Sequence, residues 1–268
     1  MNIRKERGQR GFTLAELLVS STVFLLMAAG AFSLLSSSSR RFKTDSQVLT
    51  SFQEARLGID QIVRDVADAG YPPRSFFFVA PLANLYAATP FAWPAPNYPL
   101  NACVVVACTT PNGFDLIIET DYGGTGANAG VRWIRYQLPA AGPNTPTTLL
   151  RADVAKVAAA DPDATTAAAL LPYLQNVMNN ATGAQIAQIR AAYPNMFPGG
   201  NPVPVFTYTF DTPTSALVGG CTSVASAPCN IRDVSITLIV QSLSRDAQSQ
   251  NLRLVELNGL AHRVNPNQ

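Results

Sequence analysis

A long uncharged stretch near the N-terminus constrains the fold of this chain more than any other feature. No charged residue occurs between Leu17 and Ser39, and residues 17–35 are predominantly apolar. A helix rises 1.5 Å per residue, so residues 17–35 would cover about 28 Å, close to the thickness of the hydrocarbon core of a bilayer. The sequence therefore predicts a helix that can span a membrane, with most of the remaining residues on one side of it.

The residues before this stretch are basic, and one carboxylate lies at its edge. Residues 1–11 contain four basic residues and one acidic residue, a net charge of +3, so the formal charge of +2 becomes −1 without them. The rest of the chain therefore lacks the excess of basic residues that is typical of proteins that bind nucleic acid. Glu16 is the fifth residue after Gly11, and an ionised carboxylate in lipid is costly unless a cation pairs with it. We therefore expect Glu16 to meet a positively charged group inside a low-dielectric assembly.

The sequence GFTLAELLVS, residues 11–20, closely resembles the class III signal of type IV pilins and the related pseudopilins. In that family a prepilin peptidase cuts after the glycine, on the cytoplasmic side of the membrane, and methylates the new N-terminus. The resemblance implies that Gly11 is the cleavage-site glycine, that Phe12 is the N-methylated first residue, and that Glu16 is the family's fifth-position glutamate. It further implies an ion pair in a filament between Glu16 of one subunit and the Phe12 amine of a neighbour.

Ala29-Gly30-Ala31 leaves a second interpretation open, because small residues in this arrangement also form a cleavage site for ordinary secretory signals. On that interpretation the mature protein would be soluble and would begin at Phe32. Two features favour the prepilin signal. The apolar run is longer than the usual ~7–15 residues of a secretory signal, and such a signal has no use for a carboxylate at Glu16.

Residues 44–73 again follow the pattern of a helix, now an amphipathic one. Apolar residues recur at alternating steps of four and three, which places them on one stripe: Val48, Phe52, Ala55, Ile59, Ile62, Val66 and Ala69. We expect charged residues to occupy the remaining surface: Glu54, Arg56, Asp60, Arg64, Asp65 and Asp68. Gly70 is the predicted C-cap, and Pro72-Pro73 prevent continuation. The sequence thus predicts one nearly continuous helix from Phe12 to about Ala69, with its second half packed on a globular head.

The end of this helix carries a second resemblance. The sequence EARLGIDQIVRDVADAGY, residues 54–71, is similar to a stretch of PilW-like minor pilins that reads A-R followed by D-x-x-x-R-D-x-x-x-A-G-Y. The matching residues are Ala55, Arg56, Asp60, Arg64, Asp65, Ala69, Gly70 and Tyr71. This resemblance favours a minor pilin of the PilW type over a major pilin.

The head contains six strand candidates. Residues 114–122 and 131–139 flank a glycine-rich turn and show the period-two pattern of an antiparallel hairpin. That turn lacks the Lys-Ser/Thr and helix start of a phosphate-binding loop. The other candidates are residues 147–154, 203–211, 230–242 and 251–264. We expect these strands to form an antiparallel sheet on the amphipathic helix.

Two segments of the head lack a strand pattern. Residues 72–112 are rich in proline and aromatic residues, so we expect an ordered loop over the core. Residues 155–196 are rich in alanine and predict one or two helices, interrupted at Pro162 and Pro172, as an insertion in the head.

Together these elements predict an α+β pilin fold. Its long N-terminal helix spans the membrane with its first half and packs on an antiparallel β-sheet head that carries an alanine-rich helical insertion. The predicted segments are a cleaved leader at 1–11, a membrane-spanning and filament-core helix at 12–39, its amphipathic continuation at 40–70 and a periplasmic or extracellular head at 71–268.

Four cysteines form two close pairs in the sequence, Cys103/Cys108 and Cys221/Cys229. Local pairs in an exported chain predict two small-loop disulfides in an oxidising compartment. Unrelated buried thiols are the alternative, and four cysteines permit three connectivities. Neither pair has the spacing of a zinc knuckle, and a single histidine, His262, is present, so we expect no metal site.

The sequence predicts no catalytic residues and no cofactor. A nucleophile–histidine triad would need His262, which we expect to be a solvated residue at a strand end. Asp115, Glu119 and Asp121 fall on one strand and are expected to be an edge or turn set of acids, without the spacing of a calcium-binding loop. The chain is therefore expected to be a structural protein rather than an enzyme.

The resemblance as a whole implies a minor pilin that primes or joins a type IV pilus. Its implied partners are prepilin peptidase, other pilin and minor pilin subunits, the inner-membrane assembly platform and, before assembly, membrane lipid. The implied location is the inner membrane with the head in the periplasm, then the filament at the cell surface. A J-type pseudopilin of type II secretion is the alternative of the same class, and a secreted binding or catalytic domain is the alternative of another class.

Overall fold

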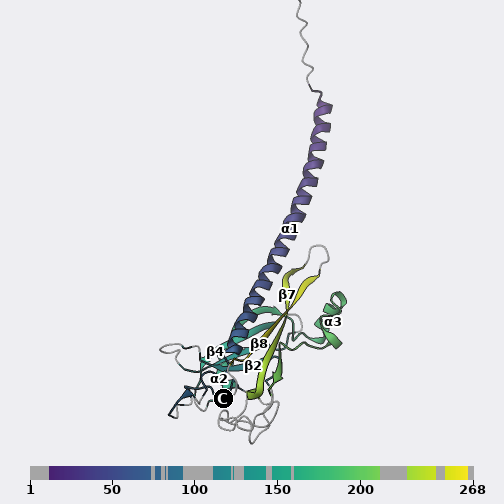
Figure 1. The fold of residues 1–268 in the computed structure, drawn as a ribbon. Coiled ribbons are helices and arrows are strands. Elements are labelled where there is room, and N and C mark those ends of the chain that lie inside the picture. The colour runs from purple at the N-terminus through teal and green to yellow at the C-terminus, as the bar shows by residue number, and fades with distance from the viewer. Residues whose placement is uncertain are drawn as a thin grey trace, which may run out of the picture.

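The computed structural model of this chain describes residues 12–73, 76–79, 82, 84–92, 111–121, 123, 130–142, 147–157, 160–211, 228–245 and 251–264. Within these residues the chain forms a long helix, α1, and a head whose strands make one antiparallel sheet (Figure 1). The helix extends far beyond the head at its N-terminal end and lies against the sheet at its C-terminal end. This is the pilin-like α+β architecture that the sequence predicts.

Helix α1 runs without interruption from Leu14 to Ala67, a length of 54 residues. Thr13 is its N-cap, and Asp68 is its C-cap. The predicted C-cap, Gly70, lies two residues farther on with a φ of 86°, a conformation that glycine adopts without strain. Its N–H donates to the carbonyl of Glu119 at 2.8 Å and directs the chain toward the sheet. One nearly continuous helix is therefore confirmed, and its C-cap is corrected from Gly70 to Asp68.

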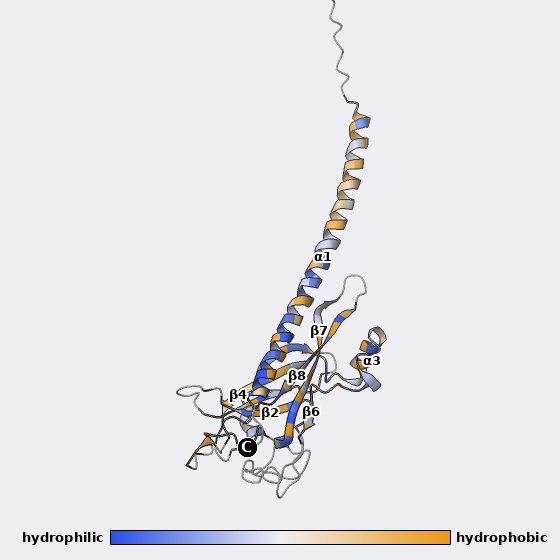
Figure 2. Cartoon of the chain, in the orientation of Figure 1, coloured by the Kyte–Doolittle hydropathy of each residue, from blue (hydrophilic) through white to orange (hydrophobic). Residues whose placement is uncertain are grey.

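The first half of α1 projects away from the head. Its large apolar side chains between Phe12 and Leu35 are exposed, and Figure 2 shows that hydrophobic turns predominate in this half. Among the described residues, α1 is the one helix long and apolar enough to cross a membrane. Exposed apolar surface of this extent is unfavourable in water, so this half requires a lipid or protein environment.

The second half of α1 packs on the sheet through the predicted stripe. Phe52 is half-buried, and the other members of the stripe are buried: Val48, Ala55, Ile59, Ile62, Val66 and Ala69. Thr44 is also buried, so the packed surface begins five residues after Ser39. The head therefore covers α1 almost to the point where the uncharged stretch ends.

Within the described residues the sheet has eight strands, and these strands pair with one another in antiparallel fashion. The bounds are β1 Phe91–Ala92, β2 Asp115–Thr120, β3 Arg132–Gln137, β4 Thr147–Ala155, β5 Leu171–Val177, β6 Phe206–Phe210, β7 Ile231–Arg245 and β8 Leu252–His262. Strands β1 to β5 lie side by side in chain order, and β5 then pairs with β7. All six predicted strands are present, and β2 and β3 form the predicted hairpin with Ile118 opposite Ile134.

Strand β7 lies between β8 on one side and β5 and β6 on the other. One of its edges pairs with β8 between Asp233 and Arg245. The other edge pairs with β6 between Ile231 and Ile236, and with β5 at Val240. The β7–β8 hairpin rises beside α1 toward its N-terminal half (Figure 1).

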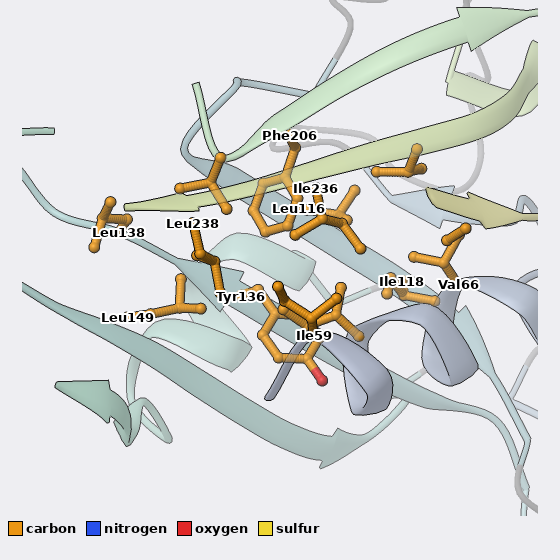
Figure 3. Packing of buried hydrophobic residues seen from close by; sticks show 14 of the residues in the cluster. Ile59, Val66, Leu116, Ile118, Tyr136, Leu138, Leu149, Phe206, Ile236 and Leu238 are labelled. Atoms are coloured by element: carbon orange, nitrogen blue, oxygen red, sulfur yellow. The ribbon is translucent and has the colours of Figure 1, made fainter. Parts of the chain in front are cut away.

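The main hydrophobic core lies between the sheet and the second half of α1 (Figure 3). Ile59 and Val66 enter it from the helix, and the strands contribute residues that include Leu116, Ile118, Tyr136, Leu149, Phe206, Ile236 and Leu238. Burial of apolar surface is the main stabilising contribution, about 25 cal/mol per Å². The core thus attaches the head to the helix by packing as well as by the chain connection.

The alanine-rich segment 155–196 is only partly helical. The predicted helices are present as α2, Pro162–Ala167, and α3, Gly183–Ala192, but strand β5 lies between them. Pro162 begins α2 rather than interrupting a helix, because the first helical position needs no N–H donor. Pro172 lies in β5 opposite Leu150. Pairing with β4 and β7 has overridden the helix propensity of the surrounding sequence.

Residues 72–112 contain the two-residue edge strand β1, and residues 93–110 of this segment lie outside the described residues. Two short 3-10 helices complete the described elements, Pro198–Gly200 and Pro228–Asn230. Cys103, Cys108 and Cys221, together with the side chain of Cys229, also lie outside the part of the chain that the structure describes. The two disulfides therefore stay a prediction.

Candidate assembly site

The N-terminus of α1 forms a capping box between Thr13 and Glu16. The N–H of Glu16 donates to Oγ1 of Thr13 at 3.3 Å, and both the N–H and the hydroxyl of Thr13 donate to Oε2 of Glu16 at 3.0 Å. This arrangement satisfies donors that a helix N-terminus otherwise leaves unpaired. It was not anticipated from the sequence, although T-L-A-E has the S/T-x-x-E spacing that marks such a box.

The capping box places Glu16 close to the residue that the prepilin resemblance makes the new N-terminus. Phe12 directly precedes Thr13, and both its side chain and that of Glu16 are exposed. Within the described residues, Oε1 of Glu16 has no hydrogen-bond partner, so one carboxylate oxygen faces outward. Gly11 lies outside the described residues. In the single chain, Glu16 contacts Thr13 and leaves one oxygen available to another molecule.

Polar residues within the apolar half of α1 bond to the helix itself. The hydroxyl of Ser20 donates to the carbonyl of Leu17 at 3.0 Å, and that of Ser21 donates to the carbonyl of Leu18 at 2.9 Å. The hydroxyl of Thr22 bonds in the same way to preceding carbonyls. Hydroxyls that are satisfied in this way can lie in lipid, and their small side chains allow close helix approach.

At the other end of α1, Asp65 is buried, which corrects the expectation that it lies on the surface. Its Oδ2 accepts a hydrogen bond from the hydroxyl of Tyr136 at 2.6 Å and from Nη2 of Arg151 at 3.3 Å. Its Oδ1 accepts from the side-chain amide of Gln61 at 2.7 Å. A buried carboxylate is tolerated because these donors replace its hydration. This Asp65 cluster therefore fixes the helix against β3 and β4.

The surroundings of Tyr136 in the Asp65 cluster keep its phenol protonated, so that the hydroxyl can donate a hydrogen bond. Burial raises the pKa of Tyr136 well above its usual range, and the neighbouring carboxylate of Asp65 raises it further. The guanidinium of Arg151 also lies over the ring of Tyr136, with 5.7 Å from its Cζ to the ring centroid. The phenol accordingly stays protonated across the physiological range.

The PilW-like stretch divides into a buried part and an exposed part. Ala55, Asp65 and Ala69 face the sheet, and Gly70 supplies the turn after the helix. The charged residues Arg56, Asp60 and Arg64 are exposed on α1. The buried part is accounted for by packing, whereas the exposed charges are available to contact other subunits.

The predicted edge or turn set of acids, Asp115, Glu119 and Asp121, is separated in the structure. Glu119 is fully buried, and its Oε2 accepts from Nζ of Lys156 at 3.1 Å, while its Oε1 accepts from the indole N–H of Trp133 at 2.8 Å. Asp115 pairs instead with Arg135, and Asp121 accepts from the N–H of Gly123. The sequence missed the burial of Glu119 because its partner Lys156 is 37 residues away.

His262 is an exposed strand-end residue, as expected, and is the last residue of β8. Its Nδ1 lies 2.5 Å from Oδ1 of Asp233, and the hydroxyl of Thr209 donates to Oδ2 of the same carboxylate at 2.6 Å. The hydrogen bond from Thr209, followed by the contact with His262, lowers the pKa of Asp233. Among the described residues, no group of three or more His, Cys, Asp or Glu side chains could hold a metal ion.

Comparison with known protein families gives one match, to the prokaryotic N-terminal methylation motif over residues 7–32. No curated protein and no solved structure matches the chain. The matched residues include Gly11, Phe12 and Glu16, and they lead into the exposed half of α1. This prepilin-type signal, together with the architecture, supports a type IV pilin-like or pseudopilin-like protein that is held in a membrane by a single N-terminal helix. It implies processing by prepilin peptidase and assembly with other pilins, and suggests a structural subunit.

Proposed function

We propose that this chain is a minor pilin of the PilW type, a subunit that primes or joins a type IV pilus. The observation that carries the proposal is the methylation motif at residues 7–32, which includes the start of a helix that is exposed in its first half and packed on a head in its second half. The exposed apolar half of α1 can lie first in the hydrocarbon core of the inner membrane and then in the interior of a filament. The similarity of residues 54–71 to PilW-like minor pilins supports the finer assignment.

In the proposed function, prepilin peptidase cuts between Gly11 and Phe12 and methylates the Phe12 amine. The exposed Oε1 of Glu16 in one subunit then pairs with the Phe12 amine of a neighbour. A buried ion pair adds little net stability, but leaving one of its members alone costs about 3–5 kcal/mol. The pair therefore selects the axial register in which each Glu16 meets an amine.

The proposed location follows from the same helix. Before assembly, α1 spans the inner membrane with the head in the periplasm, and afterwards the subunit belongs to the filament at the cell surface. Its partners are the inner-membrane assembly platform and other pilins. The exposed charges of Arg56, Asp60 and Arg64 supply a polar surface of α1 for contacts between neighbouring subunits.

A J-type pseudopilin of type II secretion is the second candidate, because its class shares the same signal and the same helix-on-sheet architecture. Deletion of the gene separates the two. Loss of surface pili with normal protein secretion supports the minor pilin. Loss of secretion with normal piliation supports the pseudopilin.

The mature N-terminus tests the proposal most directly. Mass spectrometry of the membrane-extracted protein should find a chain that begins with N-methylated Phe12. A soluble chain beginning at Phe32 would instead support a secreted domain behind an ordinary signal peptide. An uncut chain beginning at residue 1 would contradict the prediction of a prepilin signal.

A further inference from the structure

Three basic residues lie within one turn of α1 at the point where its uncharged stretch ends. Arg40, Arg41 and Lys43 are exposed, and none of their side chains has an ion-pair or hydrogen-bond partner among the described residues. We call these three residues the basic ring. Because successive helical residues are rotated by about 100°, the three side chains cover an arc of about 160° around the helix. Phe42, also exposed, completes this turn.

The basic ring lies at the depth of lipid headgroups. Arg40 follows Leu35 by five residues, which is about 7.5 Å along the helix axis. The headgroup region extends several ångströms beyond the hydrocarbon core on each side, since a core of about 30 Å lies within a bilayer of about 40–45 Å. With residues 17–35 in the core, Arg40 lies at the outer edge of the headgroup region. Because Cα–Cβ bonds tilt toward the N-terminus of a helix, the long side chains of the basic ring reach back toward the phosphates.

The part of the head closest to the uncharged stretch also lies beside the basic ring. Asp45, the first acidic residue after Glu16, pairs with Arg253 of β8 at 3.0 Å from Nη1 to Oδ1. This ion pair joins the hairpin of β7 and β8 to α1 about 7.5 Å beyond Arg40 along the axis. Since Asp45 is already paired, the three charges of the basic ring are not neutralised by the nearest carboxylate.

We infer that the basic ring binds the anionic headgroups of the membrane leaflet that faces the head and seats the head on that surface. Three basic side chains within one helical turn, with no acidic residue between Leu17 and Thr44, match a planar anionic layer that crosses the helix at this level. The inference rests on the proposed function for the membrane-spanning role of α1. Once residues 1–11 are removed, the basic side chains flanking the span all lie on the head side, where the positive-inside rule gives no reason for them.

Lipid selectivity measured with spin-labelled lipids tests this inference. The processed chain, residues 12–268, is placed in phosphatidylcholine bilayers with spin-labelled phosphatidylglycerol or spin-labelled phosphatidylcholine. Electron paramagnetic resonance then gives the fraction of each lipid whose motion the protein restricts. We expect phosphatidylglycerol to be favoured about fivefold, roughly the factor for one basic residue at an anionic surface, and the preference to vanish in about 1 M salt.

Two matched variants decide the outcome. Arg40→Gln/Arg41→Gln leaves Lys43 in place and should lower the preference by about half or more, whereas Arg56→Gln/Arg64→Gln removes the same charge farther along α1 and should leave the preference unchanged. Both pairs of side chains are exposed, so neither variant disturbs the core. Equal restriction of the two lipids by the unmodified chain, or the same loss in both variants, would overturn the inference while leaving the membrane anchor intact. Absence of any restricted lipid would overturn the anchor as well.

Discussion

Gly259 of β8 and Ile59 of α1 approach so closely that a Cβ added at Gly259 would lie 2.4 Å from Cγ2 of Ile59. Real Cβ atoms do not come this near a neighbouring carbon, so any side chain at Gly259 must displace the side chain of Ile59 or move the helix away from the strand. The glycine is thus required by close approach between α1 and the sheet, and its backbone conformation plays no part.

This approach predicts that Gly259→Ala destabilises the head by about 1–3 kcal/mol, the range for overpacking a core. Chemical unfolding of the detergent-solubilised chain, followed by near-ultraviolet circular dichroism, measures the change. Gly183→Ala is the control, because a Cβ there meets nothing within 4 Å. Equal stability of the two variants would show that α1 can move away from β8 without cost.

The Asp65 cluster predicts a loss of stability in Tyr136→Phe. Removal of the hydroxyl takes from buried Asp65 its shortest hydrogen bond, and a buried polar group that loses a partner costs about 1–3 kcal/mol. Tyr208→Phe removes a hydroxyl that bonds the carbonyl of Asn112 near the surface, and should cost less than about 1 kcal/mol. The comparison fails if the two variants unfold at the same denaturant concentration.

The ion pair between Glu119 and Lys156 predicts a larger effect. Lys156→Met leaves a fully buried carboxylate without its cation, which should cost about 3–5 kcal/mol. The double variant Glu119→Gln/Lys156→Met should recover part of this loss, because no uncompensated charge remains. Arg232→Gln, which breaks exposed pairs, should cost no more than about 1 kcal/mol. A double variant less stable than Lys156→Met would argue against the charge explanation.

The lowered pKa of Asp233 predicts a contribution to stability that depends on pH. A carboxyl whose pKa is lower in the folded state stabilises the fold above its unfolded pKa of about 3.9, and the stabilisation is lost as the pH falls through the folded pKa. Thr209→Val removes the main cause, so the pKa of Asp233 measured by nuclear magnetic resonance should rise toward its ordinary value. A pKa unchanged from that of the unmodified chain would contradict the role of Thr209.

Glu16→Gln separates the capping box from the proposed ion pair. Glutamine also completes a capping box, but it carries no charge to pair with an amine. We therefore expect normal cleavage and methylation, with incorporation into sheared filaments reduced about a hundredfold, which corresponds to about 3 kcal/mol. Thr13→Val weakens the cap but keeps the charge, so it should still be incorporated. Incorporation of Glu16→Gln at the normal level would show that assembly does not need the charge of Glu16.

The parts of the fold that could be predicted from sequence are those governed by local pattern. The period of apolar residues identified α1 and its buried stripe, and alternation identified six strands, including the β2–β3 hairpin. Strand β5 was missed because the alanine-rich sequence around it favours helix, and its pairing with β4 and β7 could not be seen in the local sequence.

The same limit applies to individual side chains. Asp65 was assigned to the surface because its local pattern shows only an acidic residue among other charges on a helix. Its partners Tyr136 and Arg151 lie 71 and 86 residues away along the chain, so no local pattern could reveal them. The burial of Glu119 was missed for the same reason, because its partner Lys156 lies 37 residues away along the chain. By contrast, the signal around Gly11, Phe12 and Glu16 is contiguous, and it is the part that matches a family motif.

The continuity of α1 has a mechanical consequence. A pull on the membrane end passes along an unbroken helix, whose attachment to the head runs parallel to the pull from Thr44 to Val66. The load is therefore applied in shear, and the apolar stripe, the Asp65 cluster and the pair of Asp45 with Arg253 resist it together. A subunit built in this way transmits tension through its whole length instead of peeling open from one end.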